Sequence, residues 1–315
     1  VIERCKSYAS KILSLDPYSL RTGLLAKKIS KELIGFMPLN DIKSWNTIKR
    51  KPICKIFRRH KICGFPPPTS GGIGVLQILG ILNHVKTGIG KELLQSQHNF
   101  IEASRLAYLD RETYVADPAF FEVPTSNLIA NNYLKKRASL INENKANYEF
   151  ESGTIGNDNR SKVKRGKSFE RPSTTHISIV DKNGNAVSLT SSIEFAFGSG
   201  ITVGGFFLNN QLTDFSFVSK NDKNENIPNK VFPGKKPRSS MSPMIIFKDD
   251  NLFGVVGSPG GSKIICYVAK SVYEILFLNT DPIAAIEKPH VCSRNKYTEI
   301  EETEKVFIER INIFG

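Results

Sequence analysis

Thr174-Thr175-His176-Ile177-Ser178-Ile179-Val180 is the stretch of sequence that decides the fold. Polar and apolar side chains alternate from His176 onward, which predicts a β-strand with one solvated face. The turn Asp181-Lys182-Asn183-Gly184-Asn185 follows at once, and Asn-Gly pairs tolerate the positive φ that hairpin turns require. A return strand is expected at about 186–192. The sequence therefore predicts a β-hairpin in the middle of the chain.

The expected hairpin brings polar groups next to Thr174. If Asn183-Gly184 forms a two-residue loop, cross-strand pairing places Thr174 opposite about residue 193. Ser192 and Glu194 would then lie beside it. We therefore expect a hydroxyl and a carboxylate around Thr174.

Thr174 is a candidate nucleophile only if it becomes an N-terminus. An internal threonine is a poor nucleophile, whereas an N-terminal one has its own α-amine as a base for its hydroxyl. An α-amine has a reference pKa of about 7.7–8.0, close to the pH at which a general base is most effective. Cleavage of the Ser173–Thr174 bond would create this group. Taken alone, Thr-Thr-His in a strand is more often only a strand.

A glycine turn, Gly257-Ser258-Pro259-Gly260-Gly261-Ser262, lies between a predicted strand and a predicted helix. The N–H groups at the start of a helix have no intrahelical partner, and they favour negative charge. Gly260 and Gly261 are therefore candidates to bind the negative oxygen of a tetrahedral intermediate. Without other motifs, a plain strand-to-helix turn would be the preferred interpretation.

Two polar pairs are candidates for binding a substrate. Ser239 and Ser240 offer hydroxyl donors for a carboxylate, and Gln211 and Asp214 offer acceptors for an ammonium group. Either pair alone is more often ordinary polar surface. Together they suit the zwitterionic head of an amino acid.

The remaining sequence predicts helices before and after a block of strands, which favours a layered α/β sandwich. Residues 66–72 read as a rigid turn that opens a helix. Residues 142–173 are rich in polar residues and read as a flexible linker that ends at the candidate cleavage site. Other helices are expected at 1–40, 98–112, 262–278 and from Asp281-Pro282, and strands at about 51–57, 60–65, 201–208, 243–248 and 252–257.

Composition is that of a globular protein, with 40% hydrophobic and 23% charged residues and a net charge of +14. The basic residues are scattered, so a solvated surface is favoured over a nucleic-acid partner. The five cysteines show no metal-ligand spacing, and no metal is expected. A disulfide between Cys54 and Cys63 is possible, although buried free thiols are preferred for the cysteines in general. Localisation cannot be read from a signal peptide or a long apolar run, because neither is present in the sequence.

Six motifs taken in order resemble the γ-glutamyltranspeptidase family over about nine-tenths of the chain. They are Pro-Pro-Pro-Thr-Ser-Gly-Gly (66–72), Thr-Thr-His (174–176), Phe-Gly-Ser-Gly (197–200), Leu-Asn-Asn-Gln-x-x-Asp-Phe-Ser (208–216), Pro-Gly-Lys-x-Pro-x-Ser-Ser-Met-Ser-Pro (233–243) and Gly-Ser-Pro-Gly-Gly-Ser (257–262). The resemblance implies a four-layer αββα sandwich of the N-terminal-nucleophile hydrolase type. It also implies autocleavage between Ser173 and Thr174.

The resemblance also implies a role for each motif residue. Thr174 would be the nucleophile, Ser192 would assist its new N-terminus, and Gly260 and Gly261 would form the oxyanion hole. Substrate recognition would fall to Ser239 and Ser240 at the α-carboxylate and to Gln211 and Asp214 at the α-amine. Glu194 stands where well-known members have asparagine, and it would also bind the α-amine.

The implied activity is that of a γ-glutamyltransferase and glutathione hydrolase, which moves a γ-glutamyl group from glutathione or glutamine to water or an amino acid without a cofactor. Residues 1–173 would be the C-terminal part of the large subunit and 174–315 a small subunit incomplete at its C-terminus, together one composite domain whose subunits stay associated. The family is usually periplasmic or secreted. The alternatives are an inactive truncated fragment and a cephalosporin or glutaryl acylase.

Overall fold

The computed structural model describes residue 27, residues 38–85, 93–147, 149–156 and 173–221, residue 224, and residues 226–294 and 297–301. They belong to two compact units. The smaller unit comprises Val1–Arg50 and Ser192–Gln211, and the larger comprises Lys51–Ser191 and Leu212–Gly315. Most of the helix expected at 1–40 lies outside the described residues.

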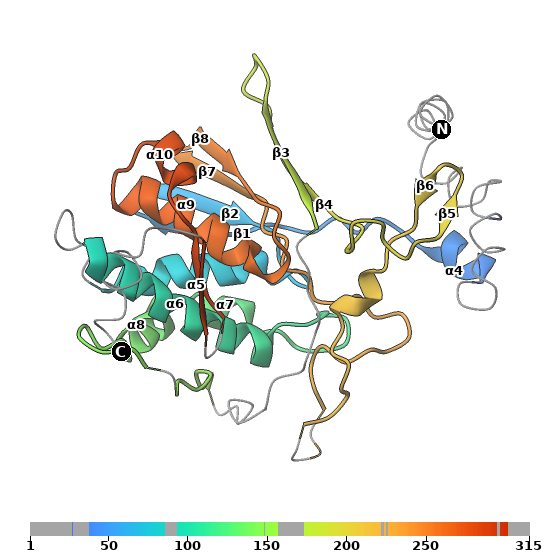
Figure 1. Ribbon diagram of the computed structural model, residues 1–315, viewed down its shortest axis with the longest axis horizontal. Helices are drawn as coiled ribbons and strands as arrows, with labels where there is room; N and C mark the ends of the chain where they lie inside the picture. Colours follow the sequence, from blue (N-terminus) through green and yellow to red (C-terminus); the bar gives the residue numbers. More distant parts are fainter. Residues whose placement is uncertain are drawn as a thin grey trace. The chain divides into compact units, whose positions relative to one another are not determined.

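The larger unit is built on a four-stranded antiparallel sheet of β1 (Ile53–Phe57), β2 (His60–Gly64), β7 (Met244–Lys248) and β8 (Asn251–Val256), in the order β1-β2-β7-β8 (Figure 1). The two central strands come from distant parts of the sequence, since His60 lies opposite Lys248. The sheet confirms the two predicted strand pairs. It also joins segments on either side of the predicted cleavage site.

Helix α5 (Gly71–Leu82) packs against β1 and β2, and α6 (Leu93–Tyr114) and α9 (Ile264–Phe277) pack against α5 (Figure 1). Every residue of α5 is buried, because its sequence is apolar except at Gln77, whose amide donates to Asp110 and to Leu128 O. Its glycines allow close packing: a Cβ on Gly80 would lie 2.4 Å from Leu134 Cδ1 of α8 (Asn131–Ala138). Thus the predicted helices at 98–112 and 262–278 and the helix after residue 72 are confirmed.

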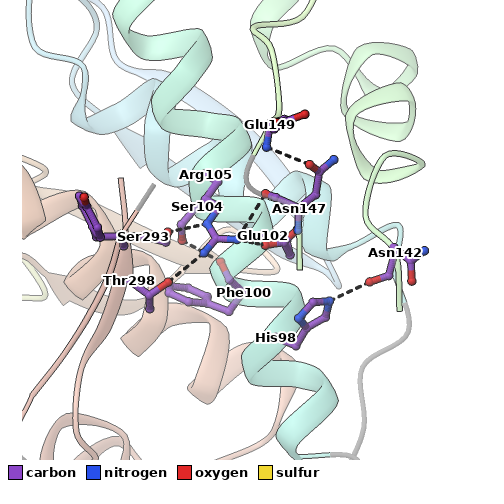
Figure 2. Close-up of polar contacts among 11 residues, drawn as sticks. His98, Phe100, Glu102, Ser104, Arg105, Asn142, Asn147, Glu149, Ser293 and Thr298 are labelled. Atoms are coloured by element: carbon purple, nitrogen blue, oxygen red, sulfur yellow. Dashed lines mark hydrogen bonds and ion pairs between the residues drawn. The ribbon is translucent and has the colours of Figure 1, made fainter. Parts of the chain in front are cut away.

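Arg105 on α6 fastens the later parts of the larger unit to this helix (Figure 2). It forms a buried ion pair of 2.5 Å with Glu102, and its Nε donates to Ser293 Oγ at 2.8 Å in β9 (Val291–Ser293). Its Nη2 donates to Thr298 Oγ1 at 3.1 Å in β10 (Thr298–Ile300). Asn147 closes the cluster by donating its N–H to Glu102.

The segment after α8 differs from the predicted linker in its first half. Ser152 and Gly153 are buried. The N–H of Gly153 donates to Asp110 Oδ1 at 2.8 Å, and its carbonyl accepts from Tyr114 Oη at 2.6 Å. Because α6 supplies both partners, residues around Gly153 are anchored and are not a loose connection. The later part of the predicted linker, 157–172, lies outside the described residues.

Two disulfides correct the preference for free thiols. Cys54–Cys63 joins β1 to β2, where the strand register sets the two residues opposite each other. Cys266–Cys292 joins α9 to β9 within the core. Sequence spacing gave no sign of the second pair, because its partners meet only when α9 packs against β9.

The predicted hairpin is present as β3 (Thr175–Val180) and β4 (Ala186–Ser191). Its register differs by one residue from the expected one, since Thr175 pairs with Ser191. The N–H of Asp181 bonds to Asn185 O at 3.0 Å, so the loop has three residues, with Gly184 at a φ of 81°. The Asp181 carboxylate explains this turn, because Oδ1 accepts N–H bonds of 2.8 Å from both Asn183 and Asn185.

The smaller unit contains helix α4 (Leu39–Ser44) and a short hairpin of β5 (Thr202–Val203) and β6 (Phe206–Phe207). A single strand at 201–208 was expected, and this prediction was wrong. The chain turns at Gly204-Gly205, where both φ angles are positive.

Two further helices, α7 (Thr125–Leu128) and α10 (Pro282–Glu287), complete the list of α-helices in the described residues of the larger unit. Asp281 caps α10 as the Asp-Pro signal predicts, accepting N–H bonds from Ile283 and Ala284. None of the helices that the structure describes is long and apolar enough to cross a membrane.

Candidate active site

Thr174 directly precedes β3 and is half-buried. Strand β3 lies beside the end of β8: Ser178 Oγ donates to Val255 O at 3.4 Å, and the His176 ring lies against Gly257. The predicted oxyanion turn directly follows Gly257, so the side chains of β3 contact the residues that lead into this turn.

The turn itself has backbone angles that favour glycine. Gly260 has a φ of 134° and Gly261 a φ of 58°, and they lead into the 3₁₀ helix η4 (Gly261–Lys263) and then α9. Within the described part of the chain, no protein acceptor pairs with the N–H of Gly260 or Gly261. Two unpaired donors at the positive end of a helix suit a developing oxyanion.

Side chains from three elements hold this turn in place. Tyr108 Oη on α6 donates to the carbonyl of Ser262, and Arg294 Nη1 donates to Ser262 Oγ. Glu299 accepts from Arg294 and forms an ion pair of 2.5 Å with Lys263. Burial acts to raise the pKa of Glu299, but its hydrogen bonds and ion pairs with Lys263 and Arg294 outweigh this and hold the pKa below its usual range. The cluster restrains the predicted oxyanion turn.

Ser239 and Ser240 lie at the N-terminal end of α5. Ser70 donates from both its N–H and its Oγ to Ser239 O, each at 2.7 Å. Arg111 of α6 donates from Nε to Ser70 Oγ at 2.7 Å and from Nη2 to Ser240 Oγ at 2.6 Å. Arg111 is buried, so a positive charge lies directly behind the predicted carboxylate site.

Asp214 is buried at the end of the 3₁₀ helix η3 (Gln211–Asp214). Its backbone carbonyl accepts a hydrogen bond of 2.7 Å from Asn229 Nδ2. The structure thus connects Asp214 to the segment that leads into Ser239.

Ser192, Glu194 and Gln211 belong to the smaller unit. The structure brings Ser192 and Glu194 together, because Ser192 Oγ accepts from the Glu194 N–H at 2.9 Å. Glu194 is buried and has a φ of 73°, a strained value for a non-glycine residue. Gln211 donates its N–H to Asn209 Oδ1 at 3.0 Å.

Reasoning from sequence missed five residues that contact the candidate site: Tyr108, Arg111, Arg294, Glu299 and Asn229. The first two stand on a helix whose apolar spacing indicates only a core helix, and the others lie in segments without a motif. The one signal available in the sequence was an arginine, Arg111, within a predicted core helix.

A threonine directly before a strand, a glycine turn with unpaired N–H donors and an α+β fold are features expected of the N-terminal-nucleophile hydrolase class. Comparison with known proteins is more specific. The chain belongs to the γ-glutamyltranspeptidase family, whose sequence model matches residues 12–311.

Two curated relatives are both called glutathione hydrolase proenzyme. The protein from Bacillus subtilis is 34% identical over 93% of this chain and 51% of its own length, and that from Escherichia coli is 36% identical over 81% and 44%. This chain therefore spans about half the length of the curated relatives it matches. Among solved structures, a cephalosporin acylase from Bacillus halodurans superposes with a TM-score of 0.79 over 94% of this chain and 52% of its own, at 24% identity, which supports the fold.

Proposed function

We propose that the protein is a γ-glutamyltransferase and glutathione hydrolase activated by cleavage of the Ser173–Thr174 bond. The observation that supports this proposal is that Thr174 directly precedes β3, whose Ser178 and His176 contact Val255 and Gly257 shortly before the Gly260 turn. Membership of the γ-glutamyltranspeptidase family supports the same reaction.

The chemistry follows from an N-terminal threonine. Its α-amine takes the proton from Oγ1, which attacks the γ-carbonyl carbon of the donor. The carbonyl oxygen becomes an oxyanion that accepts hydrogen bonds from the N–H groups of Gly260 and Gly261. The intermediate collapses to a γ-glutamyl-threonine ester as the leaving amine takes a proton. Water or an amino acid then attacks the ester and releases glutamate or a γ-glutamyl product.

Recognition of the donor uses charge. Ser239 and Ser240 donate to the α-carboxylate, and the buried Arg111 makes their surroundings positive. Asp214 accepts from the α-ammonium, a role that the family resemblance also gives to Gln211 and Glu194. By the same resemblance, Ser192 would assist the new N-terminus of Thr174.

Cleavage would leave the pieces together. Strands β1 and β2 precede the Ser173–Thr174 bond and β7 and β8 follow it, yet all four form one sheet. The β2–β7 register from His60–Lys248 to Gly64–Met244 supports subunits that stay associated.

We further propose that the protein acts in the periplasm or outside the cell. The disulfides Cys54–Cys63 and Cys266–Cys292 support this location, because structural disulfides persist mainly in oxidising compartments. Cell fractionation tests it, and recovery of the protein only in the cytosolic fraction would contradict it.

The proposed activity is tested with a γ-glutamyl anilide and the complete natural protein. Thr174→Ala should abolish turnover, because it removes the nucleophile. Thr175→Ala is the matched control: it changes the adjacent threonine, which is exposed, and should keep activity. Turnover that survives Thr174→Ala would remove Thr174 from the mechanism.

An acylase acting on glutaryl groups is the second candidate, favoured by the structural likeness to a cephalosporin acylase. A glutaryl head has no α-ammonium, and it would leave the buried Asp214 without its proposed partner. Preference for a glutaryl over a γ-glutamyl anilide would decide for the acylase.

A further inference from the structure

We propose that Asn229 is a specificity-determining positioning residue. Its side-chain amide fixes the spacing between Asp214 and the Ser239-Ser240 pair, so that the site selects substrates carrying both an α-ammonium and an α-carboxylate. This inference rests on the proposed function and adds a residue that no sequence motif marked.

Asn229 is only 2% exposed, and both polar atoms of its side-chain amide form hydrogen bonds. Nδ2 donates to Asp214 O at 2.7 Å, and Oδ1 accepts from the Arg238 N–H at 2.9 Å. Its own carbonyl accepts from the Ser216 N–H at 2.9 Å. One side chain therefore bridges the end of η3 and the residue directly before Ser239.

The far end of this bridge is fixed to the core. Arg238 Nη1 donates to the carbonyls of Arg111 and Val115 at the end of α6, at 3.1 and 3.5 Å. The N–H of Lys236 donates to Asp117 Oδ2 at 2.8 Å. Asn229 thus connects Asp214 to a segment that is itself hydrogen-bonded to the C-terminal end of α6 and to Asp117.

Only an amide satisfies both contacts. Asn229 must donate at one atom and accept at the other, and a carboxylate of the same shape has no donor for Asp214 O. Asn229→Asp would place a negative charge against that carbonyl while leaving side-chain volume unchanged. The Asp214 segment would then lose its fixed distance from Ser240. The site would no longer select substrates by the spacing between an α-ammonium and an α-carboxylate.

The chemistry at Thr174 does not depend on this bridge. β3 is aligned by Ser178 and His176, and the oxyanion turn by Tyr108 and Arg294. Loss of the Asn229 bridge should therefore act on substrate selection far more than on the chemical step.

The test compares a γ-glutamyl anilide with a glutaryl anilide, which lacks the α-ammonium, in the complete natural protein. Asn229→Asp should raise KM for the γ-glutamyl substrate with little change in kcat. The kcat/KM ratio of γ-glutamyl to glutaryl substrate should fall at least about tenfold. Asn229→Gln keeps the amide and should retain part of the ratio. Asn226→Asp is the control, because this exposed asparagine lies three residues earlier and should leave the ratio unchanged.

A wild-type ratio in Asn229→Asp, with normal self-cleavage, would overturn the proposal. If Asn229→Asp does not fold, the ratio in Asn229→Gln decides, and a value equal to wild type would overturn it. If the wild-type protein shows no γ-glutamyl turnover, the proposed function itself fails, which is a distinct result.

Discussion

Tyr108 and Arg111 lie one helical turn apart on α6 and hold the two ends of the candidate active site. Tyr108 donates to Ser262 O behind the oxyanion turn, and Arg111 donates to Ser240 Oγ at the carboxylate site. The Arg111 guanidinium lies 5.8 Å from the centre of the Tyr108 ring. Since residues three apart on a helix are surface neighbours, α6 connects the candidate oxyanion turn to the candidate carboxylate site.

Tyr108→Phe should slow catalysis with little change in KM. The substitution leaves the buried Ser262 carbonyl without this donor, which costs about 1–3 kcal/mol and loosens the oxyanion turn. We expect kcat to fall about tenfold. Tyr114→Phe is the control on the same helix, because its hydroxyl holds Gly153 and not the oxyanion turn. Equal losses of kcat in both variants would show that Tyr108 acts only through stability.

Arg111→Met should change KM more than kcat, which is the opposite of the effect expected for Tyr108→Phe. It removes the positive charge and the donor to Ser240, so KM for the γ-glutamyl substrate should rise about tenfold or more, with a smaller change in kcat. Arg111→Lys keeps the charge but lacks the fork that contacts Ser70 and Ser240 together, so its KM should be intermediate. Steady-state kinetics check this order, and a KM unchanged in Arg111→Met would contradict the role.

Gly257→Ala should impair both self-cleavage and turnover. A Cβ on Gly257 would lie 2.2 Å from His176 Nδ1, so the ring would have to leave its hydrogen bonds to Thr190 and Ser178 and would disturb the start of β3. A displacement of about 1 Å at a nucleophile can cost about 100-fold in rate. Gly254→Ala is the matched control, because a Cβ there has no neighbour within 4 Å. Adding His176→Ala to Gly257→Ala should restore part of the cleavage, and no rescue would exclude the clash as the cause.

His98 should make stability fall on acidification. Burial, followed by the charge of Arg105, lowers its pKa from 6.5, although its 2.7 Å hydrogen bond to Asn142 O opposes the shift (Figure 2). The unfolded chain then binds the proton more tightly, so the contribution is complete above pH 6.5 and is lost as the pH falls through 6.5 toward the lower folded-state value.

Urea unfolding at about pH 7.5 and about pH 5.5 measures this effect. His98→Gln keeps a donor for Asn142 O and does not titrate, so it should lose less stability than wild type between the two values. Identical losses would show that His98 does not contribute. Glu102, whose pKa burial raises, is present in both proteins and cancels in the comparison.

Local patterns explain why the strands, the main helices and the glycine turn were predictable. The alternation in 174–180 and the helical spacing after Ser262 depend on neighbouring residues only. The six motifs also identified the family, which the comparisons confirm. The chemical roles of Thr174, Gly260 and the substrate-binding residues stay predictions.

Contacts between distant segments explain what was not predictable. The hairpin register depended on one carboxylate, Asp181, which favours a three-residue loop over the expected two. Tyr108 and Arg111 act through Ser262 and Ser240, more than 120 residues later in the sequence. Asn229 has no motif, and its role is visible only when Asp214 and Arg238 are brought to either side of it.

The most direct test of the central claim is the intact mass of the purified complete protein beside its Thr174→Ala variant. The account predicts that the wild-type protein splits between Ser173 and Thr174, so that a new chain begins at Thr174, and that the variant stays whole. A wild-type protein that stays whole, or a variant that splits at the same bond, would contradict the assignment of Thr174 as the nucleophile.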